Sequence, residues 1–187
     1  MASDRYVYLV QCLHAEVLRK CPTFSWRAVA INAIINKEKR FYALWRFAEY
    51  LNKSSSLLLS RFAQRIVHQL YFSYGCDIEL GTQIGPGLRI RHFNGIVINR
   101  NTRIGRQCTL RQNTTIGAAT PHVRAITLGD NVSIGANACI IGDDLHIGNN
   151  VTIGAAAFIN KNIPDNSICY SQHILLIRPK IPKEKTL

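Results

Sequence analysis

Acidic residues are scarce in this sequence. It has 11 Asp and Glu residues against 23 Lys and Arg residues, which gives a formal net charge of +12 over 187 residues. The excess is uneven, because residues 1–70 hold eleven basic side chains against four acidic ones. Such a balance favours anionic partners, namely nucleic acid, lipid headgroups or phosphorylated metabolites. Charge alone does not choose among them.

Three further features are missing. No run of eighteen uncharged apolar residues occurs, so we expect no membrane-spanning helix. The first twenty residues carry Asp4, His14 and Glu16 among apolar ones, which is unlike a secretory signal. The six cysteines include no pair with the two-residue gap of a zinc or redox motif, so we expect free thiols. Together these absences predict a cytoplasmic protein.

Apolar residues, by contrast, make up 47 % of the chain, which excludes general disorder. Residues 1–74 have helical periodicity. Ser3 or Asp4 is expected to cap a first helix that ends near Cys21, and Ser25 a second helix that runs through Asn36. A third helix is predicted by an apolar stripe with i, i+3, i+4, i+7 spacing. The residues of this stripe are Phe41, Leu44, Trp45, Ala48 and Leu51.

A fourth helix is predicted over residues 54–72, with its own apolar stripe. The stripe consists of Leu58, Phe62, Ile66 and Leu70. Arg61 and Arg65 lie off the stripe. Packing of this helix on its neighbours is the first interpretation, and a basic amphipathic surface that rests on anionic lipid is the alternative.

After Gly75 the helical period gives way to a period of six, which marks an internal repeat. Aliphatic residues recur at this spacing, and the register shifts by two residues after position 96. The repeated positions are Ile78, Ile84, Ile90 and Ile96, then Ile98, Ile104, Leu110 and Ile116, then Leu128, Ile134 and Ile140, and finally Ile147, Ile153 and Ile159.

The repeat has a simple physical interpretation. If each hexad is one short strand plus a corner, three hexads close a triangular coil of about eighteen residues, and coils stack at the ~4.8 Å strand spacing. Glycine usually follows the aliphatic residue, and we expect it to relieve the steric cost of the corner. A small or β-branched residue four positions after the aliphatic one fits where the prism narrows. Cys108 occupies such a position and is therefore predicted to fill the core.

This repeat resembles that of the hexapeptide-repeat acyltransferases. The resemblance implies a mainly β protein, with a left-handed parallel β-helix over residues 75–168. A helical region, residues 1–74, would precede the β-helix, and a basic tail, residues 169–187, would follow it.

His92 is the first candidate for chemistry, because it stands on an outward position just before the register shift. Asp77 lies fifteen residues earlier, close to one coil, and is expected to neighbour His92 in the adjacent layer. A carboxylate beside an imidazole fixes its tautomer and stabilises the imidazolium, which suits a general base acting on an alcohol. A structural role for His92 is the alternative.

The same stretch resembles the serine acetyltransferase branch of the superfamily. The residues that match its motif are Asp77, Ile84-Gly85-Pro86-Gly87, His92, Gly95 and Val97, and the fifteen-residue gap is kept. The resemblance implies that Asp77 and His92 form the catalytic dyad of an O-acetyltransferase.

Two departures bear on the acceptor. Arg91 replaces an Asp that helps the family hold an amino acid, and Asn94 replaces a Thr. The run from His92 to Asn99 is closer to acetyltransferases of bacterial exopolysaccharide synthesis, such as the colanic acid type. We therefore expect a sugar hydroxyl of a surface polysaccharide as acceptor, with Arg91 and Asn94 at the substrate. Serine is the alternative acceptor.

The resemblance also implies the remaining partners. His122, in the loop before the later coils, is the candidate for the family's second histidine, and an exposed loop histidine is the alternative. Acetyl-CoA is the expected donor, with its arm along Gly135-Ala136 and Gly154-Ala155 and its phosphate near Lys161. The family's closing motif is absent, so the tail residues Arg178, Lys180, Lys183 and Lys185 are alternative phosphate contacts.

Direct acetyl transfer in one ternary complex is the expected mechanism. No metal is expected, because the paired histidines of the zinc-binding prisms have no counterpart. Family members form trimers, which implies a homotrimer here. The rival hypotheses are a non-catalytic scaffold that docks on the inner face of the membrane through its basic helices, and a nucleic-acid binder. The coils lack the interleaved aromatic and basic residues that stack on bases, which disfavours nucleic acid.

Overall fold

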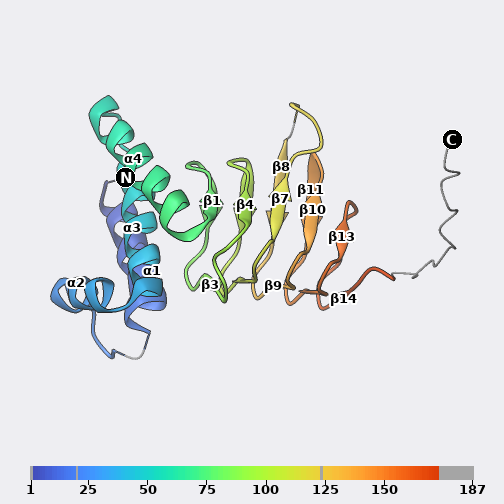
Figure 1. Ribbon diagram of the computed structural model, residues 1–187, viewed down its shortest axis with the longest axis horizontal. Helices are drawn as coiled ribbons and strands as arrows, with labels where there is room; N and C mark the ends of the chain where they lie inside the picture. Colours follow the sequence, from blue (N-terminus) through green and yellow to red (C-terminus); the bar gives the residue numbers. More distant parts are fainter. Residues whose placement is uncertain (1, 20, 123, 173–187) are drawn as a thin grey trace, which may run out of the picture.

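The computed structural model describes residues 2–19, 21–122 and 124–172, and it shows helices at one end of a three-sided β-solenoid (Figure 1). The first strand of the solenoid lies next to the helices, and the last one lies at the opposite end. The predicted tail contacts Arg178, Lys180, Lys183 and Lys185 lie outside the described residues. Among the described residues, no helix combines the length and apolar character that crossing a bilayer requires.

Four α-helices form the N-terminal region. They are α1 (Ala2–Leu13), α2 (Trp26–Ile35), α3 (Lys37–Asn52) and α4 (Leu57–Tyr74), and a π-helical turn, η1 (His14–Leu18), extends α1. Ser25 caps α2 as predicted, because its hydroxyl accepts a hydrogen bond from the Ala28 N–H. The cap predicted at Ser3 or Asp4 was wrong, since α1 already includes both residues.

The two apolar stripes differ in outcome. In α3 the predicted stripe is buried except for Leu44, which is 36 % exposed. In α4 the prediction was wrong for the first half of the stripe, because Leu58 and Phe62 are exposed. The second half of the stripe does face the core, with Leu70 buried and Ile66 packed against it, and Ala63, which is not part of the stripe, is buried as well.

The solenoid has three faces of parallel strands. The first face consists of β1 (Cys76–Ile78), β4 (Ile96–Ile98), β7 (Thr115–Gly117), β10 (Cys139–Ile141) and β13 (Phe158–Ile159). The second consists of β2 (Gln83–Ile84), β5 (Thr102–Ile104), β8 (Ala125–Leu128) and β11 (Asp144–Ile147). The third consists of β3 (Arg89–Ile90), β6 (Thr109–Leu110), β9 (Ser133–Ile134), β12 (Thr152–Ile153) and β14 (Ile168–Cys169).

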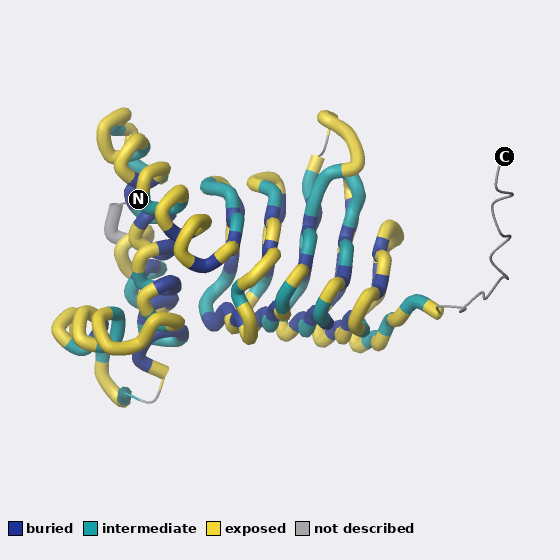
Figure 2. The backbone as a smooth tube through the Cα atoms, viewed as in Figure 1, coloured by how far each residue is buried: buried dark blue, intermediate teal, exposed yellow. Residues whose placement is uncertain are grey.

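The predicted hexad register is confirmed. On each face the aliphatic residues stand opposite one another in successive coils, so that Ile78, Ile98 and Ile116 form one column. All of the repeated aliphatic residues are buried, and buried positions recur from strand to strand (Figure 2). Ile96 stands opposite Cys76, which places the two extra residues of the first coil in the corner between β3 and β4.

The role predicted for glycine needs correction. A Cβ on Gly85 would lie 2.7 Å from the carbonyl carbon of Gly105 in the next coil, and neither residue has the left-handed backbone of a turn. Glycine is therefore required by the close approach of two coils. In the later coils asparagine takes left-handed corner positions, for example Asn131 and Asn137, with φ of 58° and 59°.

The thiols behave as predicted. All six cysteines are free, and Cys12, Cys76 and Cys108 are buried. Burial raises the pKa of the Cys108 thiol to about 12. Cys108 therefore fills the core as a neutral side chain.

A buried ion pair joins the helices to the first coil. The Arg46 guanidinium donates to both carboxylate oxygens of Glu16, at 2.9 and 2.5 Å, and to the carbonyl of Ile84 at 2.7 Å. Glu16 in turn accepts from the backbone N–H groups of Gly87 and Leu88. Burial alone would lower the pKa of Arg46, but Glu16 raises it well above its usual value. Both charged groups belong to the helices, and each is satisfied by the other and by backbone groups of the first coil.

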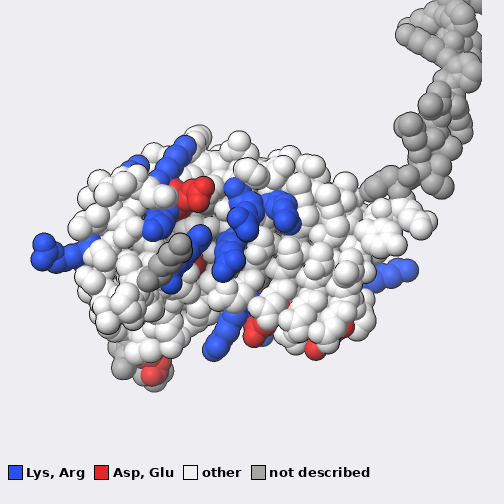
Figure 3. Space-filling model, turned by 90° about the horizontal axis from the view of Figure 1, so that it is seen from below, with Lys and Arg blue, Asp and Glu red and all other residues white. Residues whose placement is uncertain are grey.

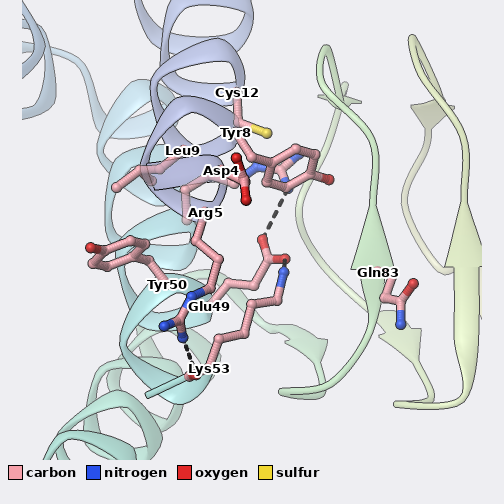
Figure 4. A pocket seen from close by; sticks show the side chains of 10 residues that line it. Asp4, Arg5, Tyr8, Leu9, Cys12, Glu49, Tyr50, Lys53 and Gln83 are labelled. Atoms are coloured by element: carbon pink, nitrogen blue, oxygen red, sulfur yellow. Dashed lines mark hydrogen bonds and ion pairs between the residues drawn. The ribbon is translucent and has the colours of Figure 1, made fainter. Parts of the chain in front are cut away.

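A cavity of about 460 Å³ opens beside this junction (Figure 4). Tyr8 of α1, Glu49 of α3 and Lys53, which follows α3, face Gln83 of β2 across it. The Lys53 ammonium pairs with Glu49 at 2.6 Å. The polar groups in this wall therefore already have partners within the chain.

We predict that Gly85→Ala destabilises the protein, because the new methyl group meets the backbone of the next coil. The expected loss is about 1–3 kcal/mol in the free energy of unfolding, measured by urea titration. Gly117→Ala is the matched control, since its Cβ would meet only side-chain atoms, Ile141 Cδ1 at 3.4 Å and Thr115 Cγ2 at 4.0 Å, and its effect is expected to stay within about 0.5 kcal/mol. Equal losses in the two variants would contradict the close-approach argument.

Arg46→Met is predicted to cost about 3–5 kcal/mol, because it leaves the Glu16 carboxylate buried without its cation. Arg100→Met is the control, since the Glu79–Arg100 ion pair is largely exposed and is expected to contribute about 1 kcal/mol or less. Urea titration of both variants measures the difference. A loss for Arg46→Met no larger than the control would show that the junction does not depend on this pair.

Candidate active site

The corner that carries His92 is held against the helices. It spans residues 91–95, between β3 and β4, and the Gly95 N–H donates to the carbonyl of Gly75 at 2.8 Å. Gly75 is the left-handed residue that ends α4, with φ of 63°. The longest corner of the first coil therefore rests on the C-terminal end of a helix.

Phe93 anchors this corner in the helical core. Its ring centroid lies 4.8 Å from that of Phe41 and 5.3 Å from that of Tyr74. His92 and Asn94, on either side of Phe93, are exposed. Burying the middle side chain thus presents the His92 imidazole to solvent. Sequence reasoning missed Phe93, although a large aromatic residue in a corner of polar residues is a signal for such an anchor.

Three predicted site residues meet in one cavity. Arg91, His92 and Asn94 line a hollow of about 290 Å³. The other lining residues come from α3 and α4 and from the same corner, and they are Lys37, Glu38, Ser73, Tyr74 and Phe93. Two cations and one carboxylate line this cavity, which disfavours a positively charged acceptor.

Asp77 lies on the first face, at the middle of β1. Its partner in the next coil is Val97. His92, fifteen residues after Asp77, therefore lies in the corner before β4 and not opposite Asp77. Asp77 lines a separate, larger cavity of about 610 Å³ with Glu79 and Arg100. Within the described part of the chain, the Asp77 carboxylate makes no hydrogen bond to the His92 imidazole.

The predicted donor residues share an edge of the prism with His92. The corner of His92 begins at residue 91, directly after β3. Gly135 directly follows β9 and Gly154 directly follows β12, and all three strands belong to the third face. A Cβ on Gly135 would lie 2.4 Å from the Ala155 nitrogen, so the two dipeptides stack directly. The two dipeptides carry no large side chains themselves, but Tyr170 lies next to Gly154, where a Cβ would be 3.0 Å from the Tyr170 Cβ. The Arg111 guanidinium also donates to the Ile134 carbonyl at 3.5 Å.

Lys161 and His122 lie on another edge. Lys161 follows β13, and the His122 loop joins β7 to β8, so both are at the corner between the first and second faces. His122 is exposed, and its backbone N–H donates to the Thr120 hydroxyl oxygen at 3.2 Å. A single chain therefore does not bring His122 or Lys161 to the edge that carries His92.

Asp143 holds the His122 loop. Its carboxylate accepts from the backbone N–H groups of Ala119 and Thr120 at 3.0 and 2.8 Å. These bonds, that of Thr120 above all, lower the pKa of Asp143 from its usual 3.8. The anchor is complete above pH 3.8 and is lost as the pH falls through the lowered pKa. The sequence around Asp143 carries no signal for this role, because both donors lie more than twenty residues away in the chain.

No group of three His, Cys, Asp or Glu side chains within the described ranges is arranged to hold a metal ion. This finding concerns residues 2–19, 21–122 and 124–172 only.

The chain is similar to two named kinds of acetyltransferase. It is 33 % identical over 138 residues to serine acetyltransferase of Staphylococcus xylosus, which covers 72 % of this chain and 62 % of that protein. It is 35 % identical over 136 residues to a protein of Escherichia coli K12 that bears the name colanic acid biosynthesis acetyltransferase WcaB, covering 68 % and 77 %. No protein-family model matches the sequence.

A solved structure resembles the whole architecture. Serine acetyltransferase isoform 3 from Entamoeba histolytica, in complex with cysteine, aligns with a TM-score of 0.74 at 27 % identity, over 96 % of this chain and 64 % of that one. The predicted left-handed parallel β-helix with an N-terminal helical region is thereby confirmed. The chain spans less than two thirds of that structure and of the Staphylococcus protein.

We predict that Asp143→Ala speeds amide hydrogen exchange at Ala119 and Thr120 by about tenfold, because both N–H groups lose a charged acceptor. Asp144→Ala is the control, since the adjacent Asp144 carboxylate contacts only the exposed Arg124 at 3.6 Å. Hydrogen–deuterium exchange read by mass spectrometry resolves this loop. Unchanged exchange at Ala119 and Thr120 in Asp143→Ala would show that Asp143 does not hold the loop.

Proposed function

Because the chain belongs to the serine acetyltransferase-like family of hexapeptide-repeat acyltransferases, we propose that it transfers an acetyl group from acetyl-CoA to a hydroxyl group. The observation that carries the proposal is the placement of His92. This exposed imidazole stands on a corner fixed by Phe93, at the edge where the Gly135 and Gly154 dipeptides stack.

His92 acts as general base in the proposed mechanism. Its imidazole takes the proton of the acceptor hydroxyl, and the oxygen attacks the thioester carbonyl. The C–S bond then breaks, and the imidazolium returns the proton to the departing CoA thiolate. Acetyl-CoA supplies the activated acyl group, while the chain supplies position and a base. A backbone N–H of the corner would stabilise the oxyanion.

Asp77 is proposed as the orienting carboxylate for His92. In the free chain the two side chains line separate cavities, so this role requires the imidazole to turn toward the first face when substrate binds. A carboxylate near the ring would stabilise the imidazolium during transfer.

A covalent acyl-cysteine route is disfavoured by the thiols themselves. The nucleophilic form of cysteine is the thiolate. Burial raises the pKa of Cys12 and of Cys108 to about 12, so these thiols stay protonated near neutral pH.

The proposed acceptor is a sugar hydroxyl of a surface polysaccharide or its precursor. Arg91 and Lys37 line the His92 cavity and would repel the ammonium group of an amino acid. The similarity to the colanic acid protein points in the same direction. Serine is the second candidate, favoured by the serine acetyltransferase relatives.

A homotrimer would complete the site. His92 and His122 lie on different edges of one prism, so a second copy packed against the first could place its His122 loop, and its Lys161, beside His92 and the donor edge. Arg91, Asn94 and His122 would then contact the acceptor, and Gly135, Ala136, Gly154, Ala155 and Lys161 the donor. We place the assembly in the cytoplasm, in peripheral contact with the inner face of the membrane.

We expect His92→Gln to lower kcat/KM by about 10²- to 10⁴-fold, because the general base is lost. The assay follows release of free CoA thiol from acetyl-CoA with serine and with a panel of nucleotide sugars. His146→Gln, which changes an exposed histidine on β11, is the matched control and should keep the wild-type rate. A wild-type rate in His92→Gln would show that His92 is not the general base, whereas no release of CoA thiol by the wild-type protein would favour the non-catalytic scaffold.

A further inference from the structure

Helix α4 carries an outward ridge of apolar and basic side chains. Leu58, Phe62 and Phe72 are 75 %, 52 % and 68 % exposed, at helical spacings that place them on one side together with Arg61 and Arg65. The helix contains no Asp or Glu. It runs from the short turn after α3 to the first strand of the solenoid (Figure 1). We call these five residues the α4 ridge.

The helical region as a whole has the same character. Of the large apolar side chains that are exposed among the described residues, most belong to the helices, including Ile34 and Ile35 of α2 at 71 % and 79 %. Seen from below, Lys and Arg gather over the helices and first coils, and few appear on the last coils (Figure 3). Apolar and cationic groups thus concentrate at one end of the molecule.

A cationic hollow adjoins the ridge. Arg61, Gln64, Arg65 and His68 line a depression of about 430 Å³ on the same helix. Within the described residues, neither the Arg61 nor the Arg65 guanidinium has a hydrogen bond or ion pair. Two uncommitted guanidinium groups side by side are suited to a phosphate group, because each offers several N–H donors.

The hollow adjoins the cavity of Asp77. Gln64 and His68 also line the cavity of Asp77, where the Glu79–Arg100 ion pair closes at 2.8 Å. Tyr71 of α4 lines that cavity as well, and it offers an aromatic face beside polar side chains. A phosphate held by the two arginines would therefore lie beside the cavity of Asp77.

We propose that the α4 ridge docks on an anionic bilayer, that the Arg61–Arg65 hollow binds a lipid phosphate, and that the acceptor sugar is carried on such a lipid. The acceptor part rests on the proposed function, whereas membrane docking does not. An apolar ridge flanked by cations is the pattern of helices that lie in a membrane interface. A soluble sugar nucleotide could bind its phosphates in the hollow, but its binding would not bury the exposed side chains of Leu58, Phe62 and Phe72.

Charge argues for the bilayer over a second copy of this chain. Two copies paired through this helix would bring Arg61 and Arg65 close to the same residues of the other copy, with no carboxylate on either helix to pair with them. Anionic headgroups would instead neutralise both arginines while the bilayer takes up the apolar side chains.

The test is co-sedimentation of the full chain with vesicles of phosphatidylglycerol and phosphatidylcholine, and with pure phosphatidylcholine. Binding is expected only to the anionic vesicles. Arg61→Gln/Arg65→Gln should weaken it by about 20-fold, and Leu58→Gln/Phe62→Gln should also weaken it strongly. The matched controls, Arg103→Gln/Arg106→Gln and Ile168→Gln, change exposed side chains of the coils and should bind like wild type.

Two results would overturn docking. One is wild-type binding by both ridge variants. The other is a smaller assembly for Leu58→Gln/Phe62→Gln in sedimentation equilibrium without vesicles, which would show that a second copy covers the ridge. His92→Gln is expected to bind vesicles normally, so docking is tested even if no acetyl transfer is found.

The acceptor is tested separately, with one sugar presented on a polyprenyl diphosphate in anionic vesicles or on a nucleoside diphosphate in solution. Transfer to the lipid-linked sugar should fall in the ridge variants at least as far as vesicle binding does. Equal or faster transfer to the nucleotide sugar, in a protein that binds vesicles, would overturn the lipid-linked acceptor while leaving acetyl transfer itself intact.

Discussion

The spacing between successive coils governs the rest of this structure. Parallel strands about 4.8 Å apart leave room for one column of aliphatic side chains inside each face and for no side chain where two corners touch. Ile78, Ile98 and Ile116 form such an aliphatic column, and Gly85 lies against Gly105 where two corners touch. Because the coils are locked in this way, an irregular corner becomes a fixed place on the surface, and the candidate active site occupies one such corner.

The helical region positions that corner in two ways. The Glu16–Arg46 pair holds the helices on the first coil through the backbone of residues 84–88, and Phe93 inserts the corner itself into the aromatic cluster of α3 and α4. The same helices then form part of both cavities around His92 and Asp77. Helix α4 thus carries the exposed apolar ridge and the cationic hollow, and it also lines the cavity of Asp77.

The success of the sequence predictions followed the strength of the local pattern. The six-residue period gave the coils and their register, because an aliphatic residue out of register would face solvent. Patterns on the helices were weaker guides. Leu58 and Phe62 fit a core stripe by spacing, but Ala63 allows α4 to approach α3 on another side and leaves them exposed. The local sequence did not reveal Asp143 as an anchor, because its partners, Ala119 and Thr120, lie more than twenty residues away in the chain.

The sequence by itself determined the solenoid, the family and the candidate base, since all three depend on residues at fixed short spacings around His92. Only the tertiary structure decided what surrounds that imidazole. It placed Asp77 opposite Val97 and in a separate cavity, and it put His122 on another edge of the prism. The physical reason is that the number of residues in a coil decides which residues lie opposite each other on a face. The first coil has two extra residues before β4, so the fifteen-residue gap between Asp77 and His92 does not by itself tell where the two side chains lie.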